Sequence, residues 1–205
     1  RQSLLTRLRA DLARMKPDHI VVTGDLTQLS LPVEFDKARR WLVDLGAPDR
    51  ITVVPGNHDA YVRTDWHHTF ARWTDYMVSD PMHRQTGPVR GLDNLFPTLR
   101  IRGRIALIGL SSAHPSAPHL AVGSIGVRQL ERLAALLKQT AGRGLFRIVS
   151  IHHPPISGIV SRRKQLTDSA ALLRVISRCG TELILHGHAH KTTSHFLSTH
   201  SGTIP

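Results

Sequence analysis

The sequence predicts a single α/β domain that extends over residues 1–205. Short apolar runs with the length of buried strands alternate along the chain with longer segments whose apolar residues recur at helical spacing. The composition, 40% hydrophobic and 20% charged, is that of an ordinary globular protein. No repeat, low-complexity segment or linker divides the 205 residues, a length that suits one domain.

The first half of the chain contains two helix patterns and two strand patterns. Residues 3–15 have apolar side chains at helical spacing, and residues 33–46 repeat the pattern before a glycine, which often ends a helix. Residues 18–25 and 50–59 each begin as an apolar run and end in polar residues, as expected of a buried strand entering a loop. Aromatic residues and prolines punctuate residues 60–94, where we expect helix and loop.

The second half continues the alternation. Two amphipathic helices are predicted over residues 126–140 and 168–180, the second with Asp168 or Ser169 as its N-cap. The strand patterns lie over 99–112 (a hairpin or two adjacent strands), 145–155 and 181–190, with one or two further strands in the tail, 192–205.

Four of the predicted strands end in a polar cluster. In α/β sheets the carboxyl ends of parallel strands open into one crevice, so segments far apart in the sequence can converge there. Carboxylate, amide and imidazole groups are ligands that suit Zn, Fe or Mn. Each cluster alone is a weak signal, with Gly56-Asn57-His58-Asp59 the most specific of them, but the four together indicate a metal site. The clusters are Gly24-Asp25, Gly56-Asn57-His58-Asp59, His152-His153-Pro154-Pro155 and Gly187-His188-Ala189-His190.

The short sequence motifs "GDLT", "GNHD", "HHPP" and "GHAH", in this order, resemble those of the calcineurin-like metallophosphoesterase superfamily. They are most similar to the branch of cyclic-nucleotide and glycerophosphodiester phosphodiesterases, and the match runs from Asp25 to His190. The resemblance implies a two-sheet β-sandwich flanked by helices. It also implies a two-metal site with Mn, Fe or Zn, where a metal-bound hydroxide hydrolyses a phosphoester, most simply a small phosphodiester.

The resemblance assigns ligands to each of the two ions. Asp25 would bridge them through its carboxylate. The second ion would be completed by Asn57, His152 and His188, whereas the first ion would receive His190. His188 and His190 stand in alternate positions, so they reach different ions only if the backbone turns at Gly187.

The resemblance also implies two catalytic residues. His58 would protonate the leaving-group oxygen or stabilise charge on the phosphoryl group, and Asp59 would orient the His58 ring. His153 and His186 are expected beside the site without being ligands.

The first motif of the family pattern, D-x-H, does not precede Asp25. The simplest expectation is a fragment truncated at both ends that lacks its first strand; the rival is a family member that has lost one metal. In both cases the first ion keeps only Asp25 and His190. We therefore expect one divalent ion to bind tightly and the other weakly.

The net charge of +12 suits an anionic partner. A small phosphoester is the expected one; nucleic acid is an alternative that the sequence does not favour, because no RNA-binding aromatic signature is visible. The densest basic group, Arg162-Arg163-Lys164, either meets the anionic part of the substrate or is a solvated loop.

The single cysteine, Cys179, excludes an intrachain disulfide and fits a reducing compartment, so we expect a cytoplasmic location. No apolar run approaches the ~18 residues of a membrane span.

Three functions compete with hydrolysis of a small diester. They are a pyrophosphatase acting on nucleotide-sugar lipids, a nuclease of the same superfamily, and a non-catalytic one-metal scaffold.

Overall fold

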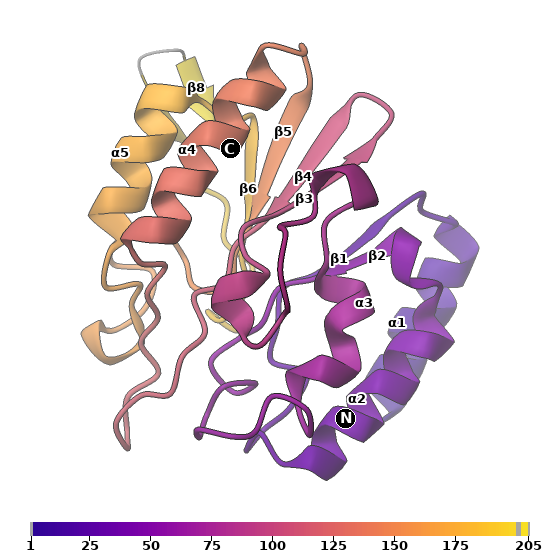
Figure 1. Ribbon diagram of the computed structural model, residues 1–205. Helices are drawn as coiled ribbons and strands as arrows, with labels where there is room; N and C mark the ends of the chain where they lie inside the picture. The colour runs from indigo at the N-terminus through magenta and orange to yellow at the C-terminus, as the bar shows by residue number, and fades with distance from the viewer. Residues whose placement is uncertain (1, 200–201, 205) are drawn as a thin grey trace.

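The structure is a computed structural model that describes residues 2–199 and 202–204. Its strands form a two-stranded sheet, a four-stranded sheet and a terminal hairpin, and helices flank the first two of these sheets (Figure 1). The α-helices are α1 (Gln2–Met15), α2 (Pro32–Leu45), α3 (Thr74–Met77), α4 (Val127–Ala141) and α5 (Ser169–Cys179). The strands are β1 (Ile20–Val22), β2 (Ile51–Val53), β3 (Thr98–Arg102), β4 (Ile105–Gly109), β5 (Phe146–Ser150), β6 (Leu183–Leu185), β7 (Leu197–Thr199) and β8 (Gly202–Ile204).

The N-terminal half is built on the parallel pair β1 and β2, in which Ile20 lies opposite Ile51. Helices α1 and α2 lie side by side next to this pair, and Arg9 of α1 pairs with Asp44 of α2 at 3.0 Å (Figure 1). A core fills the space between α2, β2 and the segment 70–77. Its largest fully buried side chains are Trp73, Tyr76, Phe35, Phe96, Leu42, Ile51 and Met77.

The C-terminal half is the four-stranded sheet in the order β3-β4-β5-β6. β3 and β4 are antiparallel, whereas β4, β5 and β6 run parallel. Helices α4 and α5 lie side by side against this sheet (Figure 1). The second core lies between helices and sheet and includes Ile108, Leu133, Leu137, Val149, Leu172, Ile176 and Ile184.

Arg100 of β3 connects the two halves. Its side chain is buried, and its guanidinium donates hydrogen bonds to four backbone carbonyls, those of Pro48 (2.5 Å), Ile51 (2.8 Å), Asp75 (2.9 Å) and Val78 (2.8 Å). Burial lowers the pKa of Arg100 to about 10, and the neighbouring charge of Arg102 acts in the same direction. One side chain thus satisfies carbonyls from two separate segments, 48–51 and 75–78.

The predicted α/β class, with two sheets flanked by helices, is confirmed. The stretch 99–112 is the hairpin β3–β4, and 60–94 contains short helical turns and loops. The predicted tail strands are β7 and β8, and His200, Ser201 and Pro205 lie outside the described residues. No helix within the described part of the chain is long and apolar enough to cross a membrane.

Asp168 occupies the N-cap position of α5, as predicted, but its carboxylate does not cap that helix. Instead it accepts hydrogen bonds from the backbone N–H groups of Ile125, at 2.9 Å, and Gly126, at 2.8 Å, just before α4. The side chain therefore joins the starts of two neighbouring helices, a tertiary contact that a local capping pattern does not reveal.

Candidate metal centre

Four side chains from four strand ends meet at one point. Asp25 follows β1, Asn57 follows β2, His152 follows β5, and His188 follows β6. The Nε2 atom of His152 lies 3.1 Å from Asn57 Oδ1, 3.1 Å from His188 Nδ1 and 3.2 Å from Asp25 Oδ2. Ligand atoms of Asp25, His152 and His188 all lie within 4.8 Å of one another. The structure thus brings together the four residues that the resemblance assigns to the second ion.

Hydrogen bonds to backbone carbonyls orient both imidazoles. His152 Nδ1 lies 2.6 Å from the carbonyl oxygen of Thr23, and His188 Nε2 lies 2.9 Å from that of Lys164. A carbonyl oxygen only accepts, so these two nitrogens carry the protons. The remaining nitrogens, His152 Nε2 and His188 Nδ1, therefore direct lone pairs toward Asn57 Oδ1 and the Asp25 carboxylate. Fixing the tautomer from behind in this way is typical of metal-binding histidines.

The donor set fits a divalent cation. In the neutral tautomers just described, all four converging atoms are acceptors, and acceptors this close repel unless a proton or a cation lies between them. Nitrogen and oxygen donors of this kind suit Zn, Fe or Mn.

The pKa shifts of His152, Asp25 and His188 also indicate that this cluster favours a positive charge. Burial works against a charged His152, but the hydrogen bond and charge of Asp25 raise the pKa of His152 above its ordinary value. Burial alone raises the pKa of Asp25, yet the His152 contact and the His58 backbone N–H bring it below the usual range. Burial, followed by the charge of His152, lowers the pKa of His188 to about 4. The cluster therefore favours positive charge at its centre and admits little of it on His188.

Unusual backbone conformations occur at two of the converging residues and at His190. Asp25 (φ 60°), His188 (φ 64°) and His190 (φ 53°) all adopt the left-handed region, which non-glycine residues seldom occupy. The turn was expected at Gly187, but Gly187 is not left-handed; the left-handed residues are His188 and His190, which follow it. Strain of this kind persists only where the surrounding structure enforces it, and it concentrates at functional sites.

Gly56 allows the β1 and β2 loops to approach closely. A Cβ atom at this position would lie 2.2 Å from Asp25 Oδ1 and 2.7 Å from His152 Cε1. We expect Gly56→Ala to displace both ligands and to weaken Mn²⁺ binding about 10-fold or more, as measured by isothermal titration calorimetry. The matched control is Gly142→Ala, where the nearest atom is 3.6 Å away and φ is −60°. Equal Mn²⁺ affinity in the two variants would contradict the assignment of these ligands.

The Asp59 carboxylate holds the two N-terminal loops together. It is fully buried and accepts backbone N–H groups of Asp25 (2.8 Å), Gly56 (2.9 Å) and Thr27 (2.8 Å). Burial raises the pKa of Asp59 to about 6, although the Gly56 and Thr27 hydrogen bonds pull the pKa down. We expected Asp59 to orient the His58 ring, but its oxygens are engaged by the backbone of the loops that carry Asp25 and Asn57.

His58 is oriented by a different group. Its Nδ1 lies 2.9 Å from the carbonyl oxygen of Gln28, so Nδ1 carries a proton and donates to that carbonyl. The ring stacks on Tyr61 with an interplanar angle of 6°. The backbone N–H of His58 donates to Asp25 Oδ1 at 2.9 Å. His58 therefore lies beside the donor set and is partly exposed, but it is not one of the converging donors.

His153 packs behind the two imidazole ligands. Its ring centroid lies 5.0 Å from that of His152 and 4.5 Å from that of His188. Its Nε2 lies 3.1 Å from the Ala121 carbonyl oxygen, so it carries the proton there, and Nδ1 accepts from Ser112 Oγ at 2.7 Å. Burial and the charges of His152 and His188 lower its pKa to about 3. His153 therefore lies next to the two imidazole ligands, in keeping with its expected place beside the site.

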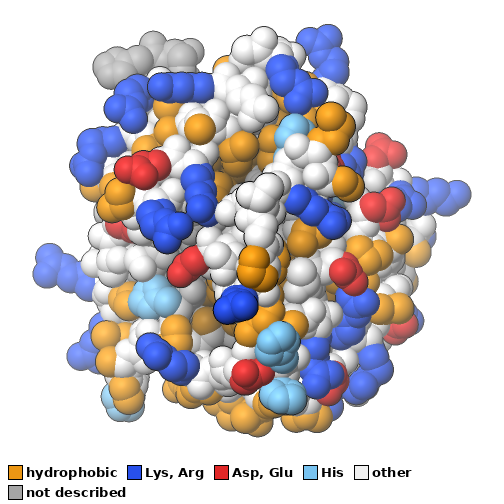
Figure 2. All heavy atoms as spheres, viewed as in Figure 1, with side chains coloured by type: hydrophobic (Ala, Val, Ile, Leu, Met, Phe, Trp, Pro, Cys, Tyr) orange, Lys and Arg blue, Asp and Glu red, His pale blue; other side chains and the backbone are white. Residues whose placement is uncertain are grey.

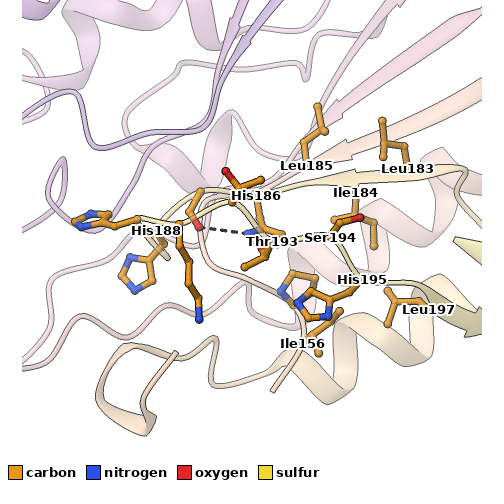
Figure 3. Close-up of a pocket in the computed structure, with 15 residues that line it drawn as sticks. Ile156, Leu183, Ile184, Leu185, His186, His188, Thr193, Ser194, His195 and Leu197 are labelled. Carbon is orange, nitrogen blue, oxygen red and sulfur yellow. Dashed lines mark hydrogen bonds between the residues drawn. The ribbon is translucent and has the colours of Figure 1, made fainter. Parts of the chain in front are cut away.

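His190 is exposed and lies outside the cluster of converging donors. With His186 and His188 it lines a cavity of about 530 Å³ beside β6 and the segment that follows it. Figure 3 shows His186, His188 and His195 around this cavity, with Ile156 and Leu197 among the apolar side chains. The assignment of His190 to a first ion stays a prediction.

Sequence reasoning missed the backbone groups that serve the site. The carbonyls of Thr23 and Lys164 set the tautomers of two ligands, and the carbonyl of Gln28 orients His58. Every residue carries a carbonyl, so no side-chain pattern marks these three. The only available signal was proximity: Thr23 stands two residues before Asp25.

Comparisons with known proteins agree with this geometry. The family model described as calcineurin-like phosphoesterase matches residues 2–192. The chain is 30% identical over 187 residues to a cAMP/cGMP dual specificity phosphodiesterase of Mycobacterium tuberculosis, a match that covers 88% of this chain and 51% of the relative. It is 26% identical to a probable cyclic nucleotide phosphodiesterase of Synechococcus sp., with coverages of 88% and 61%.

A solved crystal structure matches all of this chain and 84% of its own with a TM-score of 0.55 at 17% identity, a likeness of fold alone. The chain spans about half to three fifths of the length of the curated relatives it matches. With the family model matching nearly the whole sequence and the motif residues converging in space, this chain belongs to the calcineurin-like phosphoesterase family.

Proposed function

We propose that this chain forms the catalytic domain of a metal-dependent phosphodiesterase that hydrolyses a small phosphodiester. The observation that carries the proposal is the convergence of Asn57, His188 and Asp25 donor atoms within 3.1–3.2 Å of His152 Nε2. The printed functions of the relatives make cyclic nucleotides the first substrates to test. That Asp25 bridges two ions, with His190 on the first, is part of the same proposal.

The residues divide the work as follows. Asp25, Asn57, His152 and His188 would hold the ion. A divalent cation bound there would polarise a phosphoryl oxygen and acidify water. His58, held through its Nδ1–H, would present Nε2, which takes up a proton from solvent and passes it to the leaving-group oxygen, a role for which an imidazole is suited at neutral pH. Asp59 acts on the reaction only by positioning the loops that carry Asp25 and Asn57.

The cavity beside His188 has room for the organic group of such an ester. Its volume of about 530 Å³ falls within the range of small-molecule sites. Apolar side chains such as Ile156 and Leu197 stand on its wall beside polar ones such as Thr193 and Ser194 (Figure 3). A nucleoside or a glycerol moiety would find both kinds of contact there.

The test is hydrolysis of bis(p-nitrophenyl) phosphate and of 3′,5′-cyclic AMP, with Mn²⁺, Zn²⁺ or Fe²⁺ and after removal of metal by EDTA. We expect turnover that needs the metal. His58→Ala should lower kcat by roughly 10²–10⁴-fold and leave Mn²⁺ affinity unchanged, because His58 transfers a proton but is no ligand. His67→Ala, an exposed histidine nearby in the sequence, is the control. Absence of turnover with every metal would overturn the proposal.

A nuclease of the same family is the second candidate, favoured by the net charge of +12. Lys and Arg side chains are spread over the face seen in Figure 2 and do not gather into one stripe. A nuclease that tracks a phosphate backbone should bind DNA with a steep dependence on salt concentration. DNA binding that changes little between about 50 and 200 mM salt would eliminate this candidate.

A further inference from the structure

The basic segment Arg162–Lys164, a short 3₁₀ helix, is attached to the metal centre through its backbone. The carbonyl oxygen of Lys164 accepts the hydrogen bond from His188 Nε2 at 2.9 Å. Because this bond sets the tautomer of a metal ligand, the segment cannot move away from the centre without disturbing His188. A freely solvated loop would have no such connection.

A second contact fixes the segment from its other side. The N–H of Ala121 donates to the carbonyl of Arg163 at 2.8 Å, and the N–H of Gly123 donates to that of Gln165 at 3.1 Å. The carbonyl of Ala121 in turn receives the proton of His153 Nε2. The basic segment therefore lies between His188 and a backbone stretch that is itself bound to the histidine packed behind the ligands.

The three basic side chains are exposed and uncompensated. Among the described residues, no acidic side chain forms a salt bridge with Arg162, Arg163 or Lys164. Three positive charges on a fixed backbone beside a cation site would attract the anion that the site binds.

We propose that Arg162, Arg163 and Lys164 form an anion-binding rim of the metal centre, in which Lys164 binds the phosphate group of the substrate. The inference rests on the proposed function and adds the residues that recognise the charge of the ester. A lysine suits this task because its ammonium group is a compact charge on a flexible stem that can follow the phosphate. The rim should lower KM and contribute little to kcat, since it binds charge present before and during the reaction.

The experiment compares Lys164→Ala, and the triple change of Arg162, Arg163 and Lys164 to Ala, with Lys138→Ala and Arg143→Ala. The control residues are exposed and precede β5, at the end of the sheet opposite the centre. The Lys164 carbonyl survives in every variant, so Mn²⁺ affinity should stay unchanged. We expect KM for bis(p-nitrophenyl) phosphate to rise about 5–10-fold in Lys164→Ala and further in the triple variant, with kcat within about 2-fold.

A binding measurement separates this inference from the proposed function. The Kd of inorganic phosphate for the Mn²⁺-loaded protein should rise by a similar factor in Lys164→Ala and stay constant in the controls. If Lys164→Ala weakened phosphate binding but the wild-type protein hydrolysed no ester, the anion-binding rim would be supported and the proposed phosphodiesterase function would be wrong. If Lys164→Ala and Lys138→Ala gave the same KM and the same phosphate Kd, the segment would be a solvated loop and the inference would be overturned.

Discussion

Replacing Asp25 by asparagine should weaken divalent metal binding at least about 100-fold and remove phosphoesterase activity with it. Asp25 supplies the only formal negative charge among the four converging donors, which otherwise comprise an amide and two neutral imidazoles. Asparagine has nearly the same shape and keeps one oxygen acceptor for the His58 N–H. The change therefore removes the charge that neutralises the cation and leaves the loop contact in place.

Isothermal titration with Mn²⁺ and Zn²⁺ measures the effect directly. The control is Asp11→Asn, which removes the same charge from an exposed position on α1, where Asp11 pairs with Arg14. Thermal unfolding without metal should show that Asp25→Asn is folded. Wild-type Mn²⁺ affinity in Asp25→Asn would remove Asp25 from the ligand set, and with it the proposed centre.

Replacing Arg100 by methionine should lower the free energy of unfolding by about 3 kcal/mol or more, the largest stability effect that we expect. Methionine fills much of the same space but donates no hydrogen bond. The carbonyls of Pro48, Ile51, Asp75 and Val78 would lose their shared donor in a place where water has little access. A buried carbonyl oxygen that has no donor keeps the full free-energy penalty of its desolvation, and this penalty exceeds the net contribution of an ordinary hydrogen bond to stability.

Urea and thermal denaturation measure this loss, with a drop in Tm of roughly 6–12 °C for a domain of this size. Arg104→Met is the matched control, because Arg104 is exposed in the turn between β3 and β4. Equal unfolding free energies for Arg100→Met and Arg104→Met would show that the Arg100 guanidinium does not stabilise the junction between the two halves.

Sequence periodicity was sufficient for most of the fold. The amphipathic patterns correctly predicted α2, α4 and α5, and the short apolar runs correctly predicted β1, β2, β5 and β6. These signals are local, since a helix or strand that covers a core must place apolar residues at its own period. The region 60–94 had no such period, and its fold into short turns around Trp73 and Tyr76 depends on burial against α2 and β2.

The motif order and the family resemblance also anticipated which ligands come together. β1 and β2 belong to one sheet and β5 and β6 to another, so the carboxyl ends of two parallel pairs meet at the centre. Asp25, Asn57, His152 and His188 were predicted as one ligand set, and the structure brings their side chains together. Asp59 was assigned to the orientation of the His58 ring on the family resemblance. In the structure its buried carboxylate meets backbone N–H groups of two loops, a contact that depends on how β1 and β2 pair.

The sequence by itself thus determined the class of fold, the strand ends that carry the ligands and the chemistry of those ligands. Only the tertiary structure decided which nitrogen of each histidine faces the centre, because that choice depends on the carbonyls of Thr23 and Lys164. Only the tertiary structure brings the carbonyl of Lys164, in the basic segment, into hydrogen-bond contact with His188, which lies 24 residues further along the chain. The physical reason is that residue type and period are local properties, whereas a backbone carbonyl is identical in every residue and acquires a role solely through its position in space.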